Sequence, residues 1–239
     1  MGHLEQIRLG TSLSVLDLFS GTGAFSLGLE KAGHKTIGFC DNDPKARGVI
    51  RKHWPRVPIY SDISSLTKTT GIQSEIICGG FPCQPFSSAS HGKIVAKDLW
   101  PEMFRVISIF KPKWVIVENV QKSPMLIAEK NLKSLGYQNE LRNIKASQCG
   151  APHRRSRWWL IAHTYHKSKF SLSLDAEVEM LPELCKGLWG AENYSRAIRV
   201  PNGFTDRMDR HRLRLLGNAV LPQIPEAIGR AITNFELIK

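Results

Sequence analysis

The residues best suited to chemistry are a cysteine and a glutamate that each follow a predicted strand. Cys83 lies in GGFPCQPFSS (79–88), where glycines and prolines favour an exposed loop of defined shape. A cysteine presented in this way acts as a nucleophile when nearby positive charge favours its thiolate. Glu118 lies in VIVENV (115–120), and parallel strands would bring both residues to the same sheet edge. A cysteine and an acid can also share an edge by coincidence.

A second set of residues is typical of a nucleotide pocket. The turn DLFSGTG (17–23) joins a strand to a helix, and its glycines let a ligand approach the backbone closely. Asp41 could accept hydrogen bonds from ribose hydroxyls, and Asp62 could accept one from an adenine amino group, with Ile63 against the ring. The glycine spacing differs from GxGxxG and no Walker lysine follows, which disfavours NAD and ATP. An ordinary turn followed by surface acids would show the same residues.

Alternating strands and helices must position these side chains. Short apolar runs predict strands at 13–19, 36–40, 75–78, 114–117 and 158–162, and helices are predicted near 24–31, 43–53, 99–110 and 125–135. A last amphipathic helix carries a stripe that we expect to pack in the core, formed by Ile224, Ala227, Ile228, Ala231, Ile232 and Phe235. The alternation predicts an α/β fold, with a parallel sheet covered by helices on both faces. Residues 164–200 interrupt it and predict a small lobe.

Composition limits the class of protein and its partners. The chain has 239 residues, of which 42% are apolar and 23% charged, as in a globular protein with one sizeable core. Its net charge of +12 favours a polyanionic partner, although a generally basic surface would give the same value. No apolar run is long enough for a membrane span and the N-terminus lacks a signal-peptide core, so we expect an intracellular protein.

The five cysteines form no CxxC pair, and an odd number suits a reducing compartment. They suggest no metal site. We expect four of them to be small buried residues without chemistry.

Taken in order, the motifs resemble the DNA (cytosine-5)-methyltransferase family. The matching segments are DLFSGTGAF (17–25), FCDND (39–43), SDI (61–63), GGFPCQPFS (79–87), ENV (118–120), APHRRSRWWLIA (151–162) and RLLGNAV (214–220). Several short motifs in a fixed order are far more specific than any one of them. The resemblance implies a Rossmann-like methyltransferase sheet that uses S-adenosyl-L-methionine, with a small, shortened target-recognition lobe.

The resemblance also implies a mechanism on double-stranded DNA. Cys83 would add to carbon 6 of a flipped-out cytosine, and Glu118 would hold N3 and the exocyclic amino group. Carbon 5 would then take the methyl group, and loss of its proton would release the cysteine. Arg155 and Arg157 match the two arginines of a family pattern and would contact the base, the phosphate or the surroundings of the cysteine.

For the cofactor, the resemblance implies a pocket in which Phe19 stacks on adenine. The matching positions are Phe19, Gly21, Gly23, Asp41, Asn42, Asp62, Ile63, Gly80, Pro82, Leu99 and Asn218. Two motif positions depart from relatives. Ala24 replaces a third glycine, and His153 replaces a glutamine, which leaves the role of His153 open.

The resemblance divides the chain into a catalytic and cofactor-binding part (1–163), a short target-recognition segment (164–200) and a C-terminal part that packs back on the catalytic domain (201–239). So short a segment predicts a short or relaxed recognition sequence, since each good base contact gives only about 1–3 kcal/mol of discrimination. By analogy we expect a bacterial or phage-type modification enzyme, monomeric or weakly dimeric, in the cytoplasm of a bacterial cell or phage-infected host. A tRNA cytosine-5 methyltransferase and a catalytically inactive DNA-binding relative remain alternatives.

Overall fold

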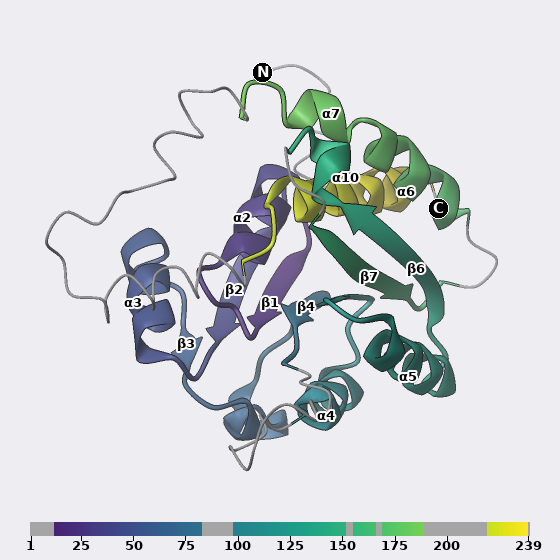
Figure 1. Ribbon diagram of the computed structural model, residues 1–239. Helices are drawn as coiled ribbons and strands as arrows, with labels where there is room; N and C mark the ends of the chain where they lie inside the picture. The colour runs from purple at the N-terminus through teal and green to yellow at the C-terminus, as the bar shows by residue number, and fades with distance from the viewer. Residues whose placement is uncertain (1–11, 83–97, 152–154, 166–168, 189–218, 239) are drawn as a thin grey trace, which may run out of the picture.

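The computed structural model describes residues 12–82, 98–151, 155–165, 169–188 and 219–238. These residues form a seven-stranded sheet in the order β3-β2-β1-β4-β5-β7-β6, with helices on both faces (Figure 1). Cys83, His153 and Asn218 lie outside the described residues, as do residues 189–200 of the predicted lobe.

Five neighbouring strands of the sheet are parallel, and four of them, all but β3, match predicted strands. They are β1 (Ser14–Leu18), β2 (Lys35–Cys40), β3 (Ile59–Tyr60), β4 (Ile76–Gly80) and β5 (Trp114–Asn119). The expectation of a wholly parallel sheet is wrong for β7 (Ser156–His163), which runs antiparallel to β5 and to β6 (Gln138–Lys145). The physical reason is the short connection between β6 and β7. It spans residues 146–155, fewer than the dozen or more that a parallel crossover needs, and its described part forms the 3-10 turn η3 (Ala146–Cys149), so the chain folds back on itself.

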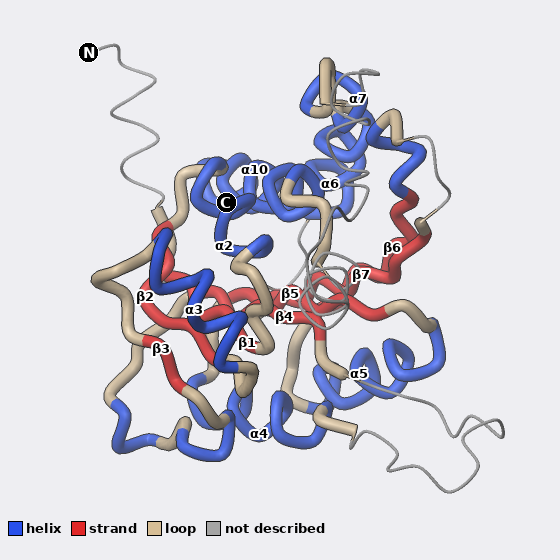
Figure 2. Tube along the Cα trace, turned by 60° about the vertical axis from the view of Figure 1, so that its left-hand side comes forward, coloured by secondary structure: helices blue, strands red, loops and turns tan. Residues whose placement is uncertain are grey.

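Two layers of helices cover the sheet (Figure 2). One face carries α2 (Ala24–Lys31), α6 (Phe170–Glu179) and α10 (Gln223–Ile238), and the other carries α4 (Trp100–Phe110) and α5 (Lys122–Ser134). Alternate residues of a strand serve the two layers. In β4, Ile76 and Cys78 pack in the cluster under α10, and Ile77 packs in the cluster over α4 and α5.

The last helix packs closely on the first part of the chain. All six residues of its predicted apolar stripe are buried, which confirms that expectation. A Cβ added to Gly28 of α2 would lie 2.2 Å from the carbonyl oxygen of Pro222, just before α10. A Cβ on Gly229 would lie 2.6 Å from the Cβ of Ala32. The absence of side chains at both glycines therefore lets α10 approach α2 directly.

The described part of the predicted lobe folds as helices α6 and α7 (Leu181–Leu184). Phe170, Leu174 and Leu181 from these helices are fully buried in the same cluster as α10. Up to residue 188, this segment therefore packs on the core of the catalytic part.

The remaining helix, α3 (Pro44–His53), follows the end of β2. Asp43 caps it by accepting a hydrogen bond from the Lys45 amide at 2.8 Å, and Pro44 stands in its first turn. Trp54 then reaches back to α2, where its Nε1 donates to the carboxylate of Glu30 at 2.9 Å. These local signals place the side chains at the end of β2 beside the glycine turn.

Candidate active site

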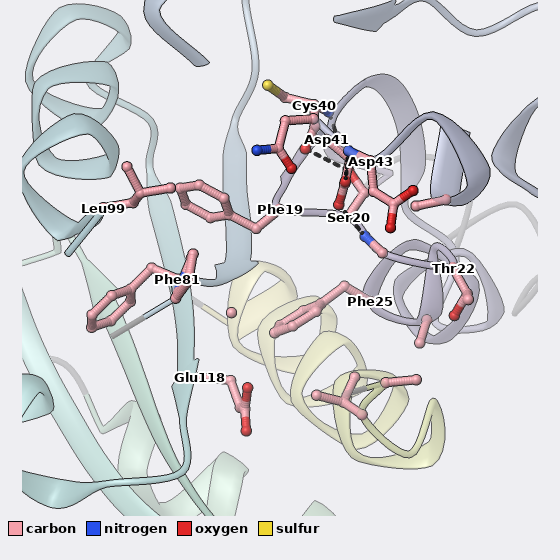
Figure 3. A pocket seen from close by; sticks show the side chains of 18 of the residues that line it. Phe19, Ser20, Thr22, Phe25, Cys40, Asp41, Asp43, Phe81, Leu99 and Glu118 are labelled. Atoms are coloured by element: carbon pink, nitrogen blue, oxygen red, sulfur yellow. Dashed lines mark hydrogen bonds between the residues drawn. The ribbon is translucent and has the colours of Figure 1, made fainter. Parts of the chain in front are cut away.

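A cavity of about 500 Å³ lies at the carboxyl ends of β1, β2, β4 and β5. Figure 3 shows Asp41 and Asp43 on one side of this hollow and Glu118 on another, with Phe25 between them and Phe19, Phe81 and Leu99 along a further side. Most of the predicted site residues line it: Phe19, Gly21, Asp41, Asn42, Asp62, Ile63, Gly80, Pro82, Leu99, Glu118 and Arg157. The volume falls in the range of roughly 300–1,000 Å³ that small-molecule sites usually have.

The glycine turn and Asp41 form one hydrogen-bonded unit. Gly21, with φ of +54°, donates its amide to Asp41 Oδ2 at 2.7 Å, and the Asp43 amide donates to Asp41 Oδ1 at 2.8 Å. Each carboxylate oxygen can still accept a second hydrogen bond. Phe19 also has a positive φ, +52°, a backbone conformation that is strained for a phenylalanine. The turn thus holds an aromatic ring and an acceptor pair beside the same cavity.

Gly23 serves the packing behind this turn. It has φ of +81° and is buried, and a Cβ there would lie 2.6 Å from the ring of Trp54. It is not among the residues that line the cavity. Its contribution is to let α3 pack against the turn.

Asp17 lies beneath the turn and is fully buried. Its Oδ2 accepts hydrogen bonds from the Ser26 hydroxyl at 2.8 Å and from the Ser26 amide at 3.3 Å. Burial raises the pKa of this carboxyl to about 8, against the lowering effect of both Ser26 contacts. Asp17 is therefore mostly neutral at pH 7 and anchors the start of α2.

Glu118, at the end of β5, lies between a glycine and an arginine. Gly80 is its register partner on β4, and a Cβ on Gly80 would lie 2.8 Å from Glu118 Oε2. Arg157 of β7 forms an ion pair with it, with 2.8 Å between Nε and Oε1. Only 7% of Glu118 is exposed. The missing side chain at Gly80 thus makes room for the carboxyl, which Arg157 holds at the cavity wall.

Burial raises the pKa of Glu118 to about 7, although Arg157 and then Arg155 act to lower it. At neutral pH the carboxyl can therefore both hold and release a proton, as a general acid requires. Arg155 lies outside the cavity lining, and its Nη2 donates to the carbonyl oxygen of Ala219 at 2.7 Å. Ala219 lines the cavity, so Arg155 anchors the segment that follows Asn218.

The cavity wall also includes the two ends of the stretch that contains Cys83. The Leu99 amide donates to the Pro82 carbonyl at 3.3 Å, and Asn119 Nδ2 donates to the Phe81 carbonyl at 3.1 Å. Pro82, the residue before Cys83, lines the cavity. The other four cysteines are buried, as expected, and burial raises the pKa of each thiol above its ordinary value.

Sequence reasoning missed several cavity residues. Phe25, Val120, Ala219 and Val220 line the hollow, and all four lie in or beside the motifs. Their apolar side chains look like core residues in the sequence, and only the fold separates the two roles. Among the described residues, no group of three or more His, Cys, Asp or Glu side chains could hold a metal ion, and no helix is long and apolar enough to cross a membrane.

Comparison with known proteins gives the family. Type II methyltransferase M2.BsuMI of Bacillus subtilis is 32% identical over 171 residues, which cover 66% of this chain and 43% of that protein. M.HindV of Haemophilus influenzae is 32% identical over 169 residues, or 66% and 55% of the two chains. The chain thus aligns with less than half of the length of the first curated relatives.

Solved structures show the same fold. The crystal structure of a putative DNA modification methyltransferase encoded within an E. coli prophage has a TM-score of 0.63 at 20% identity, covering 94% of this chain and 99% of that one. The crystal structure of S. pombe Dnmt2 methyltransferase has a TM-score of 0.59 at 18% identity and covers 83% of this chain and 64% of that one. A model of C-5 cytosine-specific DNA methylases matches residues 13–186, so the chain belongs to the C-5 cytosine-specific DNA methylase family.

Proposed function

We propose that this protein transfers a methyl group from S-adenosyl-L-methionine to carbon 5 of cytosine in double-stranded DNA. The observation that carries the proposal is Glu118. It is a buried carboxyl with a pKa of about 7, paired with Arg157 on the wall of a cavity whose other end carries the acids of a nucleoside site. This arrangement suits a reaction in which a base must be protonated while a nearby ligand supplies a group.

The cavity residues fit S-adenosyl-L-methionine. The aromatic ring of Phe19 and the side chain of Ile63 offer apolar surfaces to adenine, and Asp41 offers acceptors to ribose hydroxyls. Gly21 leaves space, with nothing within 4 Å of an added Cβ. When bound, this cofactor would supply an electrophilic methyl group. Phe19, Asp41, Asp62 and Ile63 would hold its nucleoside part at the far side of the cavity from Glu118.

The protein's own residues would activate the cytosine. Glu118 would give its proton to N3 of the base as the Cys83 thiolate forms a bond to carbon 6, so that no net negative charge builds up on the ring. Carbon 5 then carries the electron density needed to take the methyl group. A water molecule would then take the carbon 5 proton, and the electron pair left behind would form the carbon 5–carbon 6 double bond as the bond to Cys83 breaks. The N3 proton would return to Glu118, which regenerates the thiolate and the carboxyl and releases 5-methylcytosine. Arg157 would stabilise Glu118 as a carboxylate after the proton has left.

DNA is the substrate that the surroundings of the cavity suit best. Val120, at the cavity edge, is 60% exposed, and the Lys122 ammonium lies 4.9 Å from the centre of the Trp158 ring. An exposed apolar side chain two residues from a cation held on an aromatic ring is suited to an unstacked nucleotide and its phosphate. The net charge of +12 favours the same partner.

We also propose a short or relaxed recognition sequence. Helices α6 and α7 use part of the range 164–200 for core packing, which leaves fewer residues to read base edges. Bisulfite sequencing of DNA from expressing cells would measure the site. A fixed site of six or more base pairs would contradict this proposal.

Covalent trapping on DNA that contains 5-fluorocytosine tests the mechanism. We expect an adduct with the wild-type protein and cofactor, none with Cys83→Ser, and one with Cys185→Ala, which removes a different buried thiol. Absence of the wild-type adduct, or its persistence in Cys83→Ser, would refute the mechanism. An inactive DNA-binding relative would bind DNA without trapping. Transfer of labelled methyl groups to tRNA but not to duplex DNA would favour the tRNA alternative.

A further inference from the structure

The segment that carries the predicted adenine contacts has little regular structure of its own. It follows the two-residue strand β3 and consists of a single 3-10 turn, η1 (Ile63–Ser65). Its internal hydrogen bonds join neighbours: Asp62 Oδ1 accepts from the Ser64 amide at 2.8 Å, and Ser65 Oγ donates to the Asp62 carbonyl at 2.6 Å. Such bonds shape the turn but do not fix its position relative to the rest of the cavity.

Arg105 of α4 connects this turn to the neighbouring helix. Its Nη2 donates to the Ile63 carbonyl at 2.8 Å, and its Nη1 donates to the Leu66 carbonyl at 2.9 Å. Its Nε donates to Glu102 Oε2 at 2.9 Å, one helical turn earlier on α4. A planar guanidinium presents its donors in a rigid fork, so the two bonds to Ile63 and Leu66 hold the turn in one place against α4.

Two walls of the cavity are therefore joined through one side chain. Ile63 lines the cavity on one side, and Leu99, the residue before α4, lines it on another. Ile63 and Leu66 also share an apolar cluster with Met103 of α4. Apolar packing is not directional and tolerates small shifts, whereas the hydrogen bonds of Arg105 fix the register of the turn against α4.

We propose that Arg105 is a positioning residue for the adenine end of the cofactor. This proposal rests on the proposed function, because only that function assigns adenine to the cavity wall at Ile63. Arg105 does not line the cavity itself, so its effect would reach the ligand only through Ile63 and Asp62. Losing it should weaken cofactor binding and leave the chemistry at Glu118 unchanged.

Direct binding distinguishes this role from general stabilisation. Arg105→Met keeps the apolar stem and removes the fork, and Arg105→Lys keeps the charge but cannot bond both carbonyls equally well. Isothermal titration with S-adenosylhomocysteine should show about tenfold weaker binding for Arg105→Met and a smaller loss for Arg105→Lys. Adenosine, which carries adenine without the amino-acid part, should lose binding by the same factor. Glu102→Gln, which leaves both carbonyl bonds in place, should bind within about twofold of wild type.

Kinetics give the second readout. For Arg105→Met we expect KM for the cofactor to rise about tenfold, with kcat at saturating cofactor and KM for DNA nearly unchanged. Wild-type affinity in Arg105→Met, or a fall in kcat that matches the rise in KM, would overturn the proposal. If Arg105→Met does not fold, wild-type affinity for both ligands in Arg105→Lys would overturn it as well. A wild-type protein that binds neither ligand would refute the proposed cofactor instead.

Discussion

Replacing Glu118 with glutamine should change the pH dependence of folding stability in a direction that the structure specifies. Burial raises the pKa of this carboxyl from 4.5 to about 7. Each unit of pKa corresponds to about 1.4 kcal/mol, so ionising Glu118 should cost the folded protein up to roughly 3 kcal/mol relative to the unfolded chain. This pKa already includes the lowering effects of Arg157 and Arg155. Because the carboxyl is already mostly ionised in the unfolded chain at pH 5, we expect about 2 kcal/mol of the change to fall between pH 5 and pH 8.5.

The sign follows from proton binding in the two states. Between about pH 4.5 and pH 7 the unfolded chain has lost the Glu118 proton while the folded protein keeps it. Stability from the neutral carboxyl is complete below this window and is lost as the pH rises through it. Glutamine has no proton to lose, so Glu118→Gln should gain about 2 kcal/mol relative to wild type between pH 5 and pH 8.5. Comparing two pH values cancels any constant effect of the substitution.

Urea unfolding at several pH values measures this difference directly. Glu129→Gln is the matched control. It makes the same carboxyl-to-amide change at a residue that pairs with Lys133 on α5 and lies away from the cavity lining. We expect its difference from wild type to stay within about 0.5 kcal/mol across the same range. A flat curve for Glu118→Gln, or one that falls with rising pH, would refute the assignment of a raised pKa. Single-turnover methylation by the wild type should likewise decline above about pH 7 as Glu118 loses its proton.

Three further substitutions test the packing around the site. Gly80→Ala should lower the methylation rate at least tenfold, because a Cβ there would lie 2.8 Å from Glu118 Oε2 and displace the carboxyl. Its affinity for S-adenosylhomocysteine should stay within a few-fold of wild type. An unchanged single-turnover rate would contradict this prediction. Asp17→Asn should gain stability relative to wild type as the pH rises from about 4 to about 8 and then stay level, because in this range the unfolded chain has lost the Asp17 proton while the folded protein keeps it; a pH-independent difference in urea unfolding would contradict this. Gly28→Ala should destabilise the protein by about 1–3 kcal/mol, because the added Cβ would clash with the backbone before α10. Gly48→Ala on α3, whose added Cβ would have no atom within 4 Å, should be neutral or stabilising. Equal unfolding midpoints for these two variants would contradict the close packing.

Local pattern predicted the strands that are buried along most of their length. The strands around Leu16, Ile77 and Ile116 are short apolar runs in the sequence and are fully buried in the sheet. Strand β6 was missed because it is half-exposed along most of its length and polar in sequence, so alternation is weak. The reversal of β7 follows from the short connection after β6, and counting residues between the two strands would have excluded a crossover helix.

The site was predicted from residue identity and order, but its electrostatics were not. Motifs bring Glu118 and Gly80 to one edge, yet nothing in the sequence says that the two face each other across neighbouring strands. Burial at this place, opposed by the charges of Arg157 and Arg155 from another strand, sets the pKa of Glu118. The role of Arg105 is even harder to predict from the sequence. Its two partners in the turn are backbone carbonyls, which give no signal in the residue types at those positions.

The same electrostatics distinguish a catalyst from an inert DNA-binding relative. A binding module has no need of a buried carboxyl that destabilises the folded protein when it ionises, and a glutamine at position 118 would fill the space beside Gly80 without that cost. Glu118 is instead buried beside a cavity, with two arginines acting against the effect of burial so that its pKa stays near neutrality. Such a balance suits a general acid, because the carboxyl must gain and lose a proton during turnover. An inert relative would therefore be expected to show the stability penalty of Glu118 without any matching dependence of a reaction on pH. A stability loss that levels off near pH 7, together with a methylation rate that declines with a midpoint near pH 7, would show that the same Glu118 proton governs both stability and chemistry on the base.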